Sequence, residues 1–373
     1  MAQVRSAALS IPLNDIGRQH RSLAPALAEA VARVLERGWY VHGEEHAAFE
    51  QEFAAFCRRR HCIAVGNGTD ALELALRAVG TGPGDEVVTA ANAGGYASLA
   101  ALALGAVPVL ADVREADLTL DPAAAVRLVG PRCKAVIATH LYGKLADMSE
   151  LAGRLADTGA AVIEDCAQAH GALRDGRPAG AFALIGTFSF YPSKNLGAAG
   201  DGGAVICDDD ALAARLRALR QYGWDERYRA VTPGGRNSRL DELQAAVLRL
   251  KLPHLAAWNE RRRAIVARYR QAADGTRLGL VHRPGPDYVA HLCVARHPER
   301  AAFRQRLAQR GIASAIHYPF ADHQQPAIAG RALRPLPLPV TERAVGEIVT
   351  LPCFPEMSDA EVAAVAAAIE AER

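Results

Sequence analysis

The stretch EVVTAANAGGYASLAALALGAVPVL, residues 86–110, indicates the fold of this chain. Short apolar runs at 86–89 and 107–110 are typical of buried strands, and the alanine- and leucine-rich segment 96–104 between them predicts a helix. Two strands joined by a helical crossover lie parallel in one sheet. This stretch therefore predicts an α/β fold.

The same alternation of strands and helices continues on both sides of this stretch. Further strands are expected at 61–65, 135–139, 161–164, 186–190 and 203–207, and helices at 23–37, 44–57, 69–79 and 148–156. The rhythm predicts a mostly parallel sheet with helices on both of its faces.

The pattern changes near residue 255. Long helices are expected at 240–252 and 255–272, followed by strand-like pieces at 291–295 and 313–317, a helix at 300–310, a rigid connector in RPLPLP (334–339) and a last helix from Ser358. We predict a large domain over residues 1–254 and a smaller C-terminal α+β domain over 255–373, with the boundary inside the long helices.

Composition excludes several classes of protein. The 43 basic residues nearly balance the 41 acidic ones, for a net charge of +2, which argues against a strongly basic nucleic-acid binder. No apolar run reaches the length of a membrane span, and the start, MAQVRSAALSIPLND, lacks a signal-peptide core. Seven cysteines without a CxxC pair argue against a disulfide framework or a zinc ribbon. We expect a cytoplasmic protein without a nucleic-acid partner, a membrane partner or a bound metal.

Lysine is scarce in this chain, and one lysine stands in an unusual segment. Lysine occurs only at positions 134, 144, 194 and 251, so 39 of the 43 basic residues are arginine. Lys194 lies in TFSFYPSKNLG (187–197), with Ser189 and Ser193 before it and the glycine-rich GDGGA (200–204) behind it. A lysine that arginine has not replaced indicates amine chemistry, such as a Schiff base with an aldehyde.

Two segments next to predicted strands are candidates for ligand contacts. VGNGTDA (65–71) lies between a strand and a helix, where glycines and free first-turn N–H groups suit an anion; an Asn-Gly turn with a capped helix explains it equally well. In AVIEDCAQAHG (161–171), Asp165 ends a strand and points to the crevice where such sheets bind ligands, with Gln168 and His170 nearby. A helix cap by Asp165 and a packed His170 are the structural alternative.

Two later segments stay open on local evidence alone. Asn237 in GRNSRLDELQ (235–244) precedes a helix and is interpreted either as part of an N-cap region or as part of a loop that reaches a phosphate. His317, in the run that ends with Tyr318 and Pro319, is, taken alone, more often a structural histidine than a ligand.

Taken together, from about Gly38 to the end, the residues resemble the pyridoxal-phosphate-dependent sugar aminotransferases of the DegT/DnrJ/StrS type. The segments that carry the resemblance are GNGTDALELALRA (66–78), GDEVV (84–88), HLYGKLADM (140–148), EDCAQAHGA (164–172), SFYPSKNLGAAGDGGA (189–204), NSRLDELQAA (237–246), IHYP (316–319) and LPCFPEMSD (351–359). The resemblance implies an aspartate-aminotransferase-like fold, pyridoxal phosphate (PLP) fold type I.

The resemblance assigns roles at the cofactor. Lys194 matches the lysine that forms a Schiff base with pyridoxal 5'-phosphate, and Asp165 matches the carboxylate that keeps the pyridine nitrogen protonated. Gln168 lies where the family contacts the phenolic oxygen of the cofactor. The phosphate cup is matched by three residues: Gly68, Thr69 and Ser189.

Other matches concern the partner subunit and the sugar. Asn237 matches an asparagine that reaches the phosphate of the neighbouring subunit's cofactor, which implies a homodimer with shared active sites. His317 and Tyr318 match a loop near the sugar pocket. Sugar dehydratases related to the family have histidine in place of the Schiff-base lysine, so Lys194 argues against dehydration.

One segment departs from the family pattern. Many members have an aromatic residue soon after GDEV that stacks on the pyridine ring. Here Gly94 and Gly95 occupy that place and Tyr96 follows, so the stacking residue is left open.

We therefore predict a PLP-dependent aminotransferase that uses glutamate or glutamine as donor and converts a nucleotide-linked (dTDP-type) keto-deoxysugar to an amino sugar, as in antibiotic-sugar pathways. One alternative keeps the cofactor but changes the acceptor to a keto-cyclitol or an aminobenzoate precursor. A second is a PLP-binding regulatory protein without catalysis. A third is a nicotinamide dehydrogenase, which rests only on the strand–helix alternation and the turn from Gly66 to Gly68.

Overall fold

A computed structural model describes residues 10–373, and a seven-stranded sheet lies at its centre. The strands follow the order β1-β9-β8-β5-β4-β2-β3 across the sheet. Their bounds are β1 (His61–Val65), β2 (Glu86–Ala90), β3 (Val107–Ala111), β4 (Cys133–Thr139), β5 (Ala161–Asp165), β8 (Ile185–Ser189) and β9 (Gly203–Cys207). Only β9 pairs antiparallel with its neighbours, so the other strands all run in one direction. The prediction of a mostly parallel sheet is confirmed.

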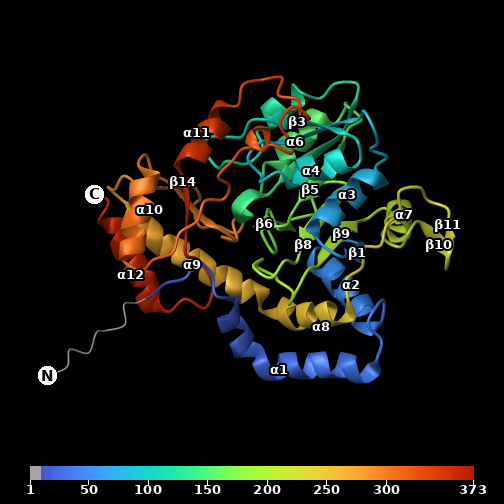
Figure 1. The fold of residues 1–373 in the computed structure, drawn as a ribbon, viewed down its shortest axis with the longest axis horizontal. Helices are drawn as coiled ribbons and strands as arrows, with labels where there is room; N and C mark the ends of the chain where they lie inside the picture. The colour runs from blue at the N-terminus through green and yellow to red at the C-terminus, as the bar shows by residue number, and fades with distance from the viewer. Residues whose placement is uncertain (1–9) are drawn as a thin grey trace.

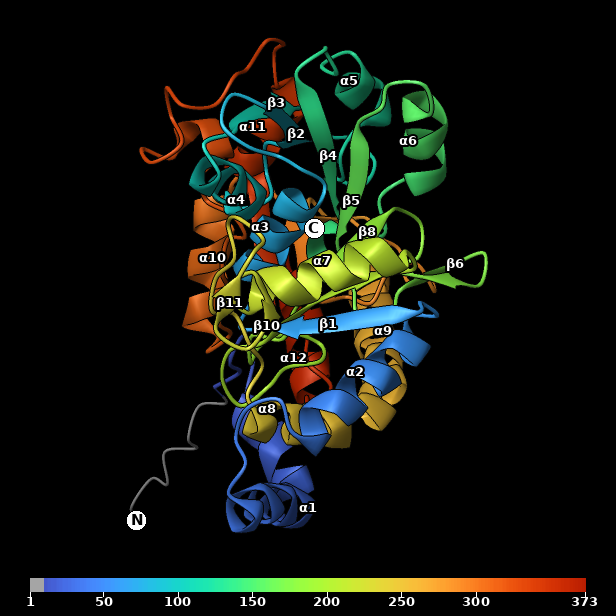
Figure 2. The same cartoon turned by 90° about the vertical axis from the view of Figure 1, so that its right-hand side faces the viewer.

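Helices cover both faces of this sheet, as Figure 2 shows. They are α1 (Ile16–Arg37), α2 (Glu44–Phe56), α3 (Gly68–Ala78), α4 (Tyr96–Ala103), α5 (Pro122–Val126), α6 (Met148–Leu155), α7 (Asp210–Arg220), α8 (Glu242–Lys251) and α9 (Leu255–Ala273). Neighbouring residues of a strand point to opposite faces. In β1, Ile63 packs in the core formed with α3, α4 and α7, while Cys62 packs in the core formed with α2 and α8.

Several helices differ from the expectations, among them α1, α7 and the short α5, which was not expected. The helix expected to start at residue 23 starts at Ile16, because the Asp15 side chain caps it by accepting the Arg18 backbone N–H at 3.2 Å, and Pro25 is accommodated inside it. Helix α7 was not expected; Asp209 caps it by accepting the Leu212 N–H at 2.7 Å.

The C-terminal part contains a second sheet with its own core. Strands β12 (Gly279–Leu280), β13 (Cys293–Arg296) and β14 (Ile348–Leu351) pair antiparallel. Helices α9, α10 (Arg300–Gln309) and α12 (Asp359–Glu370) contribute to the core that includes this sheet, and Figure 1 shows α8 and α9 running in series toward it. The prediction of a strand at 313–317 is wrong, because within this segment only Ala315 forms a β-bridge, which pairs it with Thr350. The boundary near residue 255 stays a prediction.

The proline-rich stretch follows a contact at the edge of the large sheet. The Leu110 N–H donates to the Leu333 carbonyl at 2.9 Å, and the Leu333 N–H donates to the Pro108 carbonyl at 2.8 Å. Helix α11 (Pro339–Glu347) then starts at the last proline of the stretch. Residues on both sides of this connector are therefore fixed, and the edge of β3 is partly covered.

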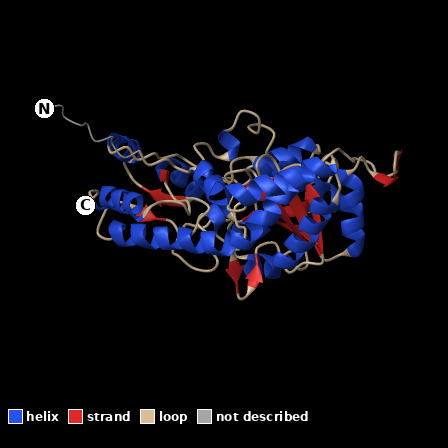
Figure 3. Cartoon of the chain, turned by 90° about the horizontal axis from the view of Figure 1, so that it is seen from below, coloured by secondary structure: helices blue, strands red, loops and turns tan. Residues whose placement is uncertain are grey.

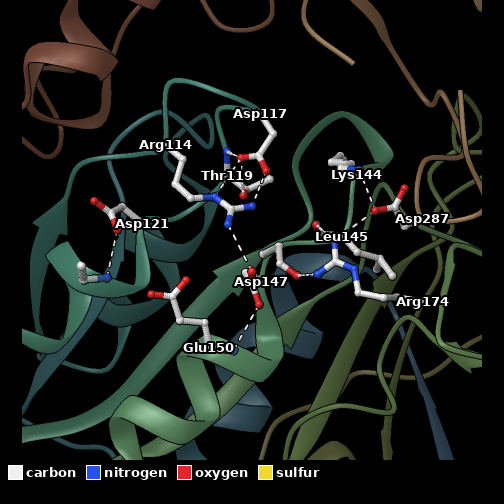
Figure 4. A network of polar contacts seen from close by, with 12 residues as sticks. Arg114, Asp117, Thr119, Asp121, Lys144, Leu145, Asp147, Glu150, Arg174 and Asp287 are labelled. Atoms are coloured by element: carbon white, nitrogen blue, oxygen red, sulfur yellow. Dashed lines mark hydrogen bonds and ion pairs between the residues drawn. The ribbon is translucent and has the colours of Figure 1, made fainter. Parts of the chain in front are cut away.

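Ion pairs tie the loop after β4 to the segment that leads into β13 (Figure 4). Lys144 and Arg174 both contact Asp287, at 2.6 and 3.1 Å. Arg114 forms a neighbouring pair with Asp147 at 3.3 Å. Lys144 is thus engaged in a structural ion pair with Asp287, so Lys194 stays the candidate for amine chemistry.

Three further features bear on the function. The hairpin of β10 (Trp224–Glu226) and β11 (Arg229–Ala230) projects beyond the body of the chain (Figures 1 and 3), and a smaller hairpin joins β6 (Leu173–Arg174) and β7 (Arg177–Pro178). All seven cysteines are free thiols. Within residues 10–373, no helix combines the length and the hydropathy that crossing a bilayer requires.

Candidate active site

Two cavities meet at Lys194. The first, of about 460 Å³, lies at the carboxyl ends of the parallel strands and is lined by Asn67, Gly68, Thr69, Leu72, Ala93, Tyr96, Thr139, Asp165, Ala167, Gln168, Ser189, Tyr191, Lys194 and Asp201. The second, of about 250 Å³, is lined mainly by residues of the C-terminal part. Tyr96, Tyr191 and Lys194 belong to both walls. The carboxyl edge of a parallel sheet is where ligands bind in such folds.

Asp165 is the last residue of β5 and its side chain is buried in the first cavity's wall. Its carboxylate accepts the Thr139 hydroxyl at 3.2 Å and the Ala167 backbone N–H at 3.1 Å. Burial raises the pKa of Asp165, and the hydrogen bond from Ala167 and the charge of Lys194 oppose that shift. A cationic group placed beside this carboxylate would therefore be stabilised.

Lys194 stands in the turn after β8, half-buried between the two cavities. Burial lowers its pKa to about 8, and Asp165 limits that shift. The adjacent Asn195 fixes the turn: its amide donates to Asn259 at 2.8 Å and to the Val289 carbonyl at 3.0 Å. The ε-amine is thus available in its neutral, nucleophilic form near pH 8.

The N-terminus of α3 lines the first cavity beside Ser189, the last residue of β8. Asn67 caps the helix by accepting the Asp70 N–H at 2.8 Å. A Cβ on Gly68 would stand 2.5 Å from the Ser189 Cβ, so only glycine lets this helix end lie against the strand. The free first-turn N–H groups, together with Thr69 and Ser189, face the cavity and suit an anion.

A chain of hydrogen bonds joins the two cavities. Gln168 accepts the Tyr142 backbone N–H at 2.6 Å and donates to the Tyr318 hydroxyl at 3.0 Å. The Tyr142 hydroxyl donates to the His317 carbonyl at 2.6 Å, and the His317 ring contacts the Thr350 hydroxyl at 2.9 Å. The sequence-predicted residues Gln168, His317 and Tyr318 are therefore connected through Tyr142.

The glycines that replace the usual aromatic residue make room for a tyrosine from another segment. Gly94 has a φ of +80°, and a Cβ there would stand 2.9 Å from the Tyr318 ring. Tyr96, in the first turn of α4, lines both cavities and meets the Tyr318 ring edge-on, with ring centroids 6.0 Å apart. In the segment 90–98, the residues that line the first cavity are thus Ala93 and Tyr96.

Two of the residues considered from the sequence lie elsewhere. Asn237 is exposed and lines neither cavity of its own chain. His170 is fully buried and packs on Phe188 and Phe190, with ring centroids 5.4 and 5.7 Å away, instead of beside Asp165. Its packed position agrees with the structural alternative, and burial lowers its pKa to about 3.

Behind Asp165, a buried carboxylate is fully occupied by protein donors. Glu164 accepts the backbone N–H groups of Gly180, Phe182 and Ala183 at 3.0, 2.7 and 2.8 Å, and contacts the His140 ring at 2.9 Å. Glu164 and His140 also form a group with Cys166 whose ligand atoms lie within 4.8 Å of one another. Because these oxygens already have partners, the group is explained by structural hydrogen bonds.

Sequence reasoning missed several cavity residues. Tyr191 lies three residues before Lys194 in the quoted SFYPSK segment, so its neighbourhood was a usable signal. Arg262 and His291 line the second cavity, but no local pattern distinguishes them from the surrounding residues.

Comparisons with known proteins agree with this geometry. A model of the DegT/DnrJ/EryC1/StrS aminotransferase family matches residues 22–370. The chain is 45% identical over 350 residues to the dTDP-3-amino-3,4,6-trideoxy-alpha-D-glucose transaminase of Streptomyces venezuelae, covering 93% of this chain and 92% of the relative. It is 43% identical over 353 residues to the erythromycin biosynthesis sensory transduction protein EryC1 of Saccharopolyspora erythraea, covering 94% and 96%. The crystal structure of S. venezuelae DesV in complex with a ketimine intermediate superposes with a TM-score of 0.94 at 42% identity, covering 98% of this chain and 99% of that one.

Proposed function

Because the chain belongs to the DegT/DnrJ/EryC1/StrS aminotransferase family, we propose that it transfers an amino group from glutamate or glutamine to a nucleotide-linked keto-sugar, dTDP-linked in the first instance. Its cofactor is pyridoxal 5'-phosphate. The observation that carries the proposal is the meeting of Lys194 and Asp165 in one cavity with the N-terminus of α3.

The residues of the first cavity fit this cofactor. An aldehyde needs a neutral amine, and the pKa of Lys194 is lowered to about 8. A pyridine nitrogen stays protonated beside a desolvated carboxylate, which Asp165 supplies. A phosphate suits the helix end that Gly68 lets approach Ser189. The cavity thus offers a partner to each polar end of the cofactor.

Each side chain has a separate task. Bound PLP supplies an electron sink for the carbon that loses a proton. We assign to the Lys194 amine the binding of the aldehyde and then the movement of the proton as general base and acid. Asp165 holds the proton on the ring nitrogen, and Gln168 contacts the phenolic oxygen. We propose that Tyr96 takes the place of the missing aromatic residue at the ring.

We also propose a cytoplasmic homodimer with shared active sites. Asn237 is exposed, and a hollow of about 1110 Å³ between the β10–β11 hairpin and α7 is lined by large side chains such as Trp39 and Tyr228. These two are 60% and 74% exposed in the single chain, which is unusual for aromatic residues of a monomer. A partner subunit that covers them would bring Asn237 to its neighbour's phosphate cup.

A complementation experiment tests the shared site. Lys194→Ala and Asn237→Asp are each expected to lose activity as homodimers. If the sites are shared, mixed dimers place both defects in one site and leave the other intact, so half of the sites recover activity. If refolded mixtures of the two variants showed no recovery of activity, the result would contradict shared active sites.

The acceptor is tested with the pyridoxamine-loaded enzyme. A dTDP-keto-hexose is expected to restore the visible absorbance of the aldehyde form, whereas scyllo-inosose and an aminobenzoate precursor are not. Lys194→Ala should abolish the turnover, and Lys134→Ala, a change at an exposed lysine, should not. Cofactor binding without single-turnover transfer would favour the regulatory alternative, to which the name of one relative points.

A further inference from the structure

A buried carboxylate lies beside the segment that supplies Tyr96. Asp322 begins the short turn η3 (Asp322–Gln324), four residues after Tyr318. Its side chain is 1% exposed, and it takes part in none of the ion pairs that residues 10–373 form. One of its oxygens, Oδ1, has no hydrogen-bond partner in the described part of the chain. An unpaired carboxylate out of water costs stability, so its presence here points to a role.

Asp322 holds both sides of the glycine turn that precedes α4. Its backbone N–H donates to the Ala91 carbonyl at 2.8 Å, before the turn, and its carboxylate accepts the Ser98 hydroxyl at 2.6 Å, after the turn. Between these two contacts, Gly94 and Gly95 have left-handed φ angles of +80° and +84°. Glycine has more backbone freedom than any other residue. The turn therefore depends on outside contacts for its position, and Asp322 supplies two of them.

The Asp322 carboxylate also acts as a cap at the N-terminus of α4. This helix has no side-chain cap of its own, because its N-cap residue is Gly95, and no acidic residue stands in its first turn. Ser98, the third residue of the helix, is fully buried where it donates to Asp322. The free N–H groups and the dipole of a helix favour a negative charge beside its first turn. The ionised form of Asp322 is therefore the form that stabilises this helix end.

Two aromatic residues of the candidate site depend on this contact. Tyr96 is the first residue of α4 and lines both cavities, and its ring meets that of Tyr318 edge-on. The Tyr318 hydroxyl in turn accepts the Gln168 amide at 3.0 Å. Asp322 thus joins the segment that contains Tyr96 to the loop that contains Tyr318.

We propose that Asp322 is a positioning residue whose ionised carboxylate clamps the segment 91–98 to the loop 318–325 and keeps Tyr96 in the wall of the first cavity. This inference rests on the proposed function, in which Tyr96 stands at the pyridine ring. Protonation of Asp322 replaces a charge-assisted hydrogen bond by a neutral one, which is about half as strong, and removes the charge at the helix end. The clamp therefore weakens when the pH falls.

The surroundings of Asp322 bring its protonation into an accessible pH range. Burial raises the pKa of Asp322 to about 7, and the Ser98 hydroxyl and the Gly95 N–H oppose that shift. Burial also raises the pKa of Tyr318, so its hydroxyl stays neutral across this range. The clamp is therefore fully ionised only above about pH 7.

The neighbouring segments add few other titratable groups. Tyr96 is the only one in α4, and residues 90–95 contain none. On the loop itself, His323 contacts Glu342 of α11 at 3.4 Å, and burial lowers the pKa of that imidazole. Arg334 pairs with the same carboxylate of Glu342 at 2.9 Å. Asp322 is therefore the group whose titration controls the contact with α4.

The affinity for pyridoxal phosphate over a pH series tests the clamp without depending on turnover. Absorbance titrations compare the wild type with Asp322→Asn. At about pH 8.5 the variant should bind the cofactor about tenfold more weakly, because the amide lacks the charge of the clamp. At about pH 5.5, where the wild-type carboxyl is protonated, the two affinities should agree within about twofold. Asp157→Asn, at an exposed position, should match the wild type throughout. Equal affinities at pH 8.5, or a ratio that does not change with pH, overturns the proposal.

A second variant covers the case in which Asp322→Asn does not fold. Ser98→Ala removes the hydrogen-bond partner of the carboxylate, and alanine is favourable inside a helix. It should weaken cofactor binding at high pH and approach the wild type at low pH, as Asp322→Asn does. Ser22→Ala, at an exposed position of α1, is the matched control. Wild-type affinity of Ser98→Ala at high pH overturns the proposal.

Urea denaturation of the cofactor-free protein measures the titration of Asp322 itself. The carboxyl has a pKa of about 3.9 in an unfolded chain and about 7 in the folded one, so the folded state binds the proton more tightly. The folding equilibrium constant of the wild type should therefore fall, relative to that of Asp322→Asn, by about tenfold per pH unit between about pH 4 and 7, and then level off. A constant ratio overturns the pH-dependent clamp.

Single-turnover transamination separates this inference from the proposed function. The ratio of the wild-type rate to that of Asp322→Asn should follow the same pH course as the ratio of cofactor affinities. Transamination with a rate ratio near one at every pH would refute the clamp and leave the function standing. A pH-dependent ratio of affinities in a protein that transfers no amino group would do the reverse.

Discussion

Gly94 lies against the ring of Tyr318. The Tyr318 ring occupies the space that a side chain at position 94 would fill. A Cβ on Gly94 would stand 2.9 Å from the ring, and the Tyr318 hydroxyl accepts the Gln168 amide at 3.0 Å. The departure of this segment from the family pattern is therefore matched by packing against the loop that closes the second cavity.

Gly94→Ala should destabilise the protein and disturb this contact. The left-handed φ of +80° alone costs about 1–2 kcal/mol for a residue with a Cβ, and the clash with Tyr318 adds to it. Chemical denaturation measures the loss. Gly82→Ala is the matched control, because nothing lies within 4 Å of its added Cβ. Equal stability of the two variants would contradict the packing described here.

The pH dependence of Lys194 should differ from that of an ordinary lysine. Its pKa is lowered to about 8, so the neutral amine of the cofactor-free enzyme accumulates as pH rises through 8, well below the ~10.4 of a free side chain. Reductive methylation of the cofactor-free enzyme over a pH series, read by mass spectrometry of the Lys194 peptide, gives the midpoint. N-acetyl-lysine in the same solutions is the reference, and a midpoint near 10 for Lys194 would refute the shift.

Asp165→Asn should leave the cofactor bound but slow the reaction. The amide keeps the shape and can still accept the Ala167 N–H, but it loses the charge that holds the ring nitrogen protonated. Removing one such electrostatic partner lowers the turnover number by about 10²–10³. Since Asp165 also raises the pKa of Lys194, the methylation midpoint of Lys194 should move further down in the variant. Asp157→Asn, at an exposed position, should change neither quantity.

The parts of the fold that follow from local pattern were predictable. The strand at 203–207 has the expected bounds, and the helix around Tyr96 and the strand after it agree within one residue, because apolar runs and glycines mark their ends. The segment 313–317 also looked strand-like, but only Ala315 pairs with a strand, and the last residue, His317, lines the second cavity. Periodicity does not show whether an apolar run faces a core or a ligand.

The residues of the candidate site also fall into two groups, those that the sequence identifies and those that only the structure identifies. Lys194 and Asp165 are conspicuous in the sequence because their residue types are unusual at their places after strands. Arg262 stands between two other arginines and looks like them. Arg262 differs from its two neighbours because it is buried, donates to the Cys353 carbonyl and lines the second cavity. These contacts depend on packing between segments about ninety residues apart. No local signal contains that information.

Glu164→Gln should destabilise the protein far more than a surface substitution of the same type. The Glu164 carboxylate, itself fully buried, accepts N–H groups from Gly180, Phe182 and Ala183 and contacts the buried His140 ring. An amide nitrogen in place of one oxygen would face these donors and leave some of them unsatisfied. Breaking such a buried charged network costs about 3–5 kcal/mol.

Urea denaturation of the cofactor-free protein measures this loss without interference from cofactor binding. Glu150→Gln is the control, since the Glu150 side chain is exposed and, within residues 10–373, pairs with Arg154 of its own helix at 2.8 Å, a pair worth about 0.3–0.5 kcal/mol. Because Glu164 precedes Asp165 on the same strand, the loss should also reduce cofactor affinity, which a titration with pyridoxal phosphate detects. If Glu164→Gln matched Glu150→Gln in both measurements, the network would not hold the strand end in place.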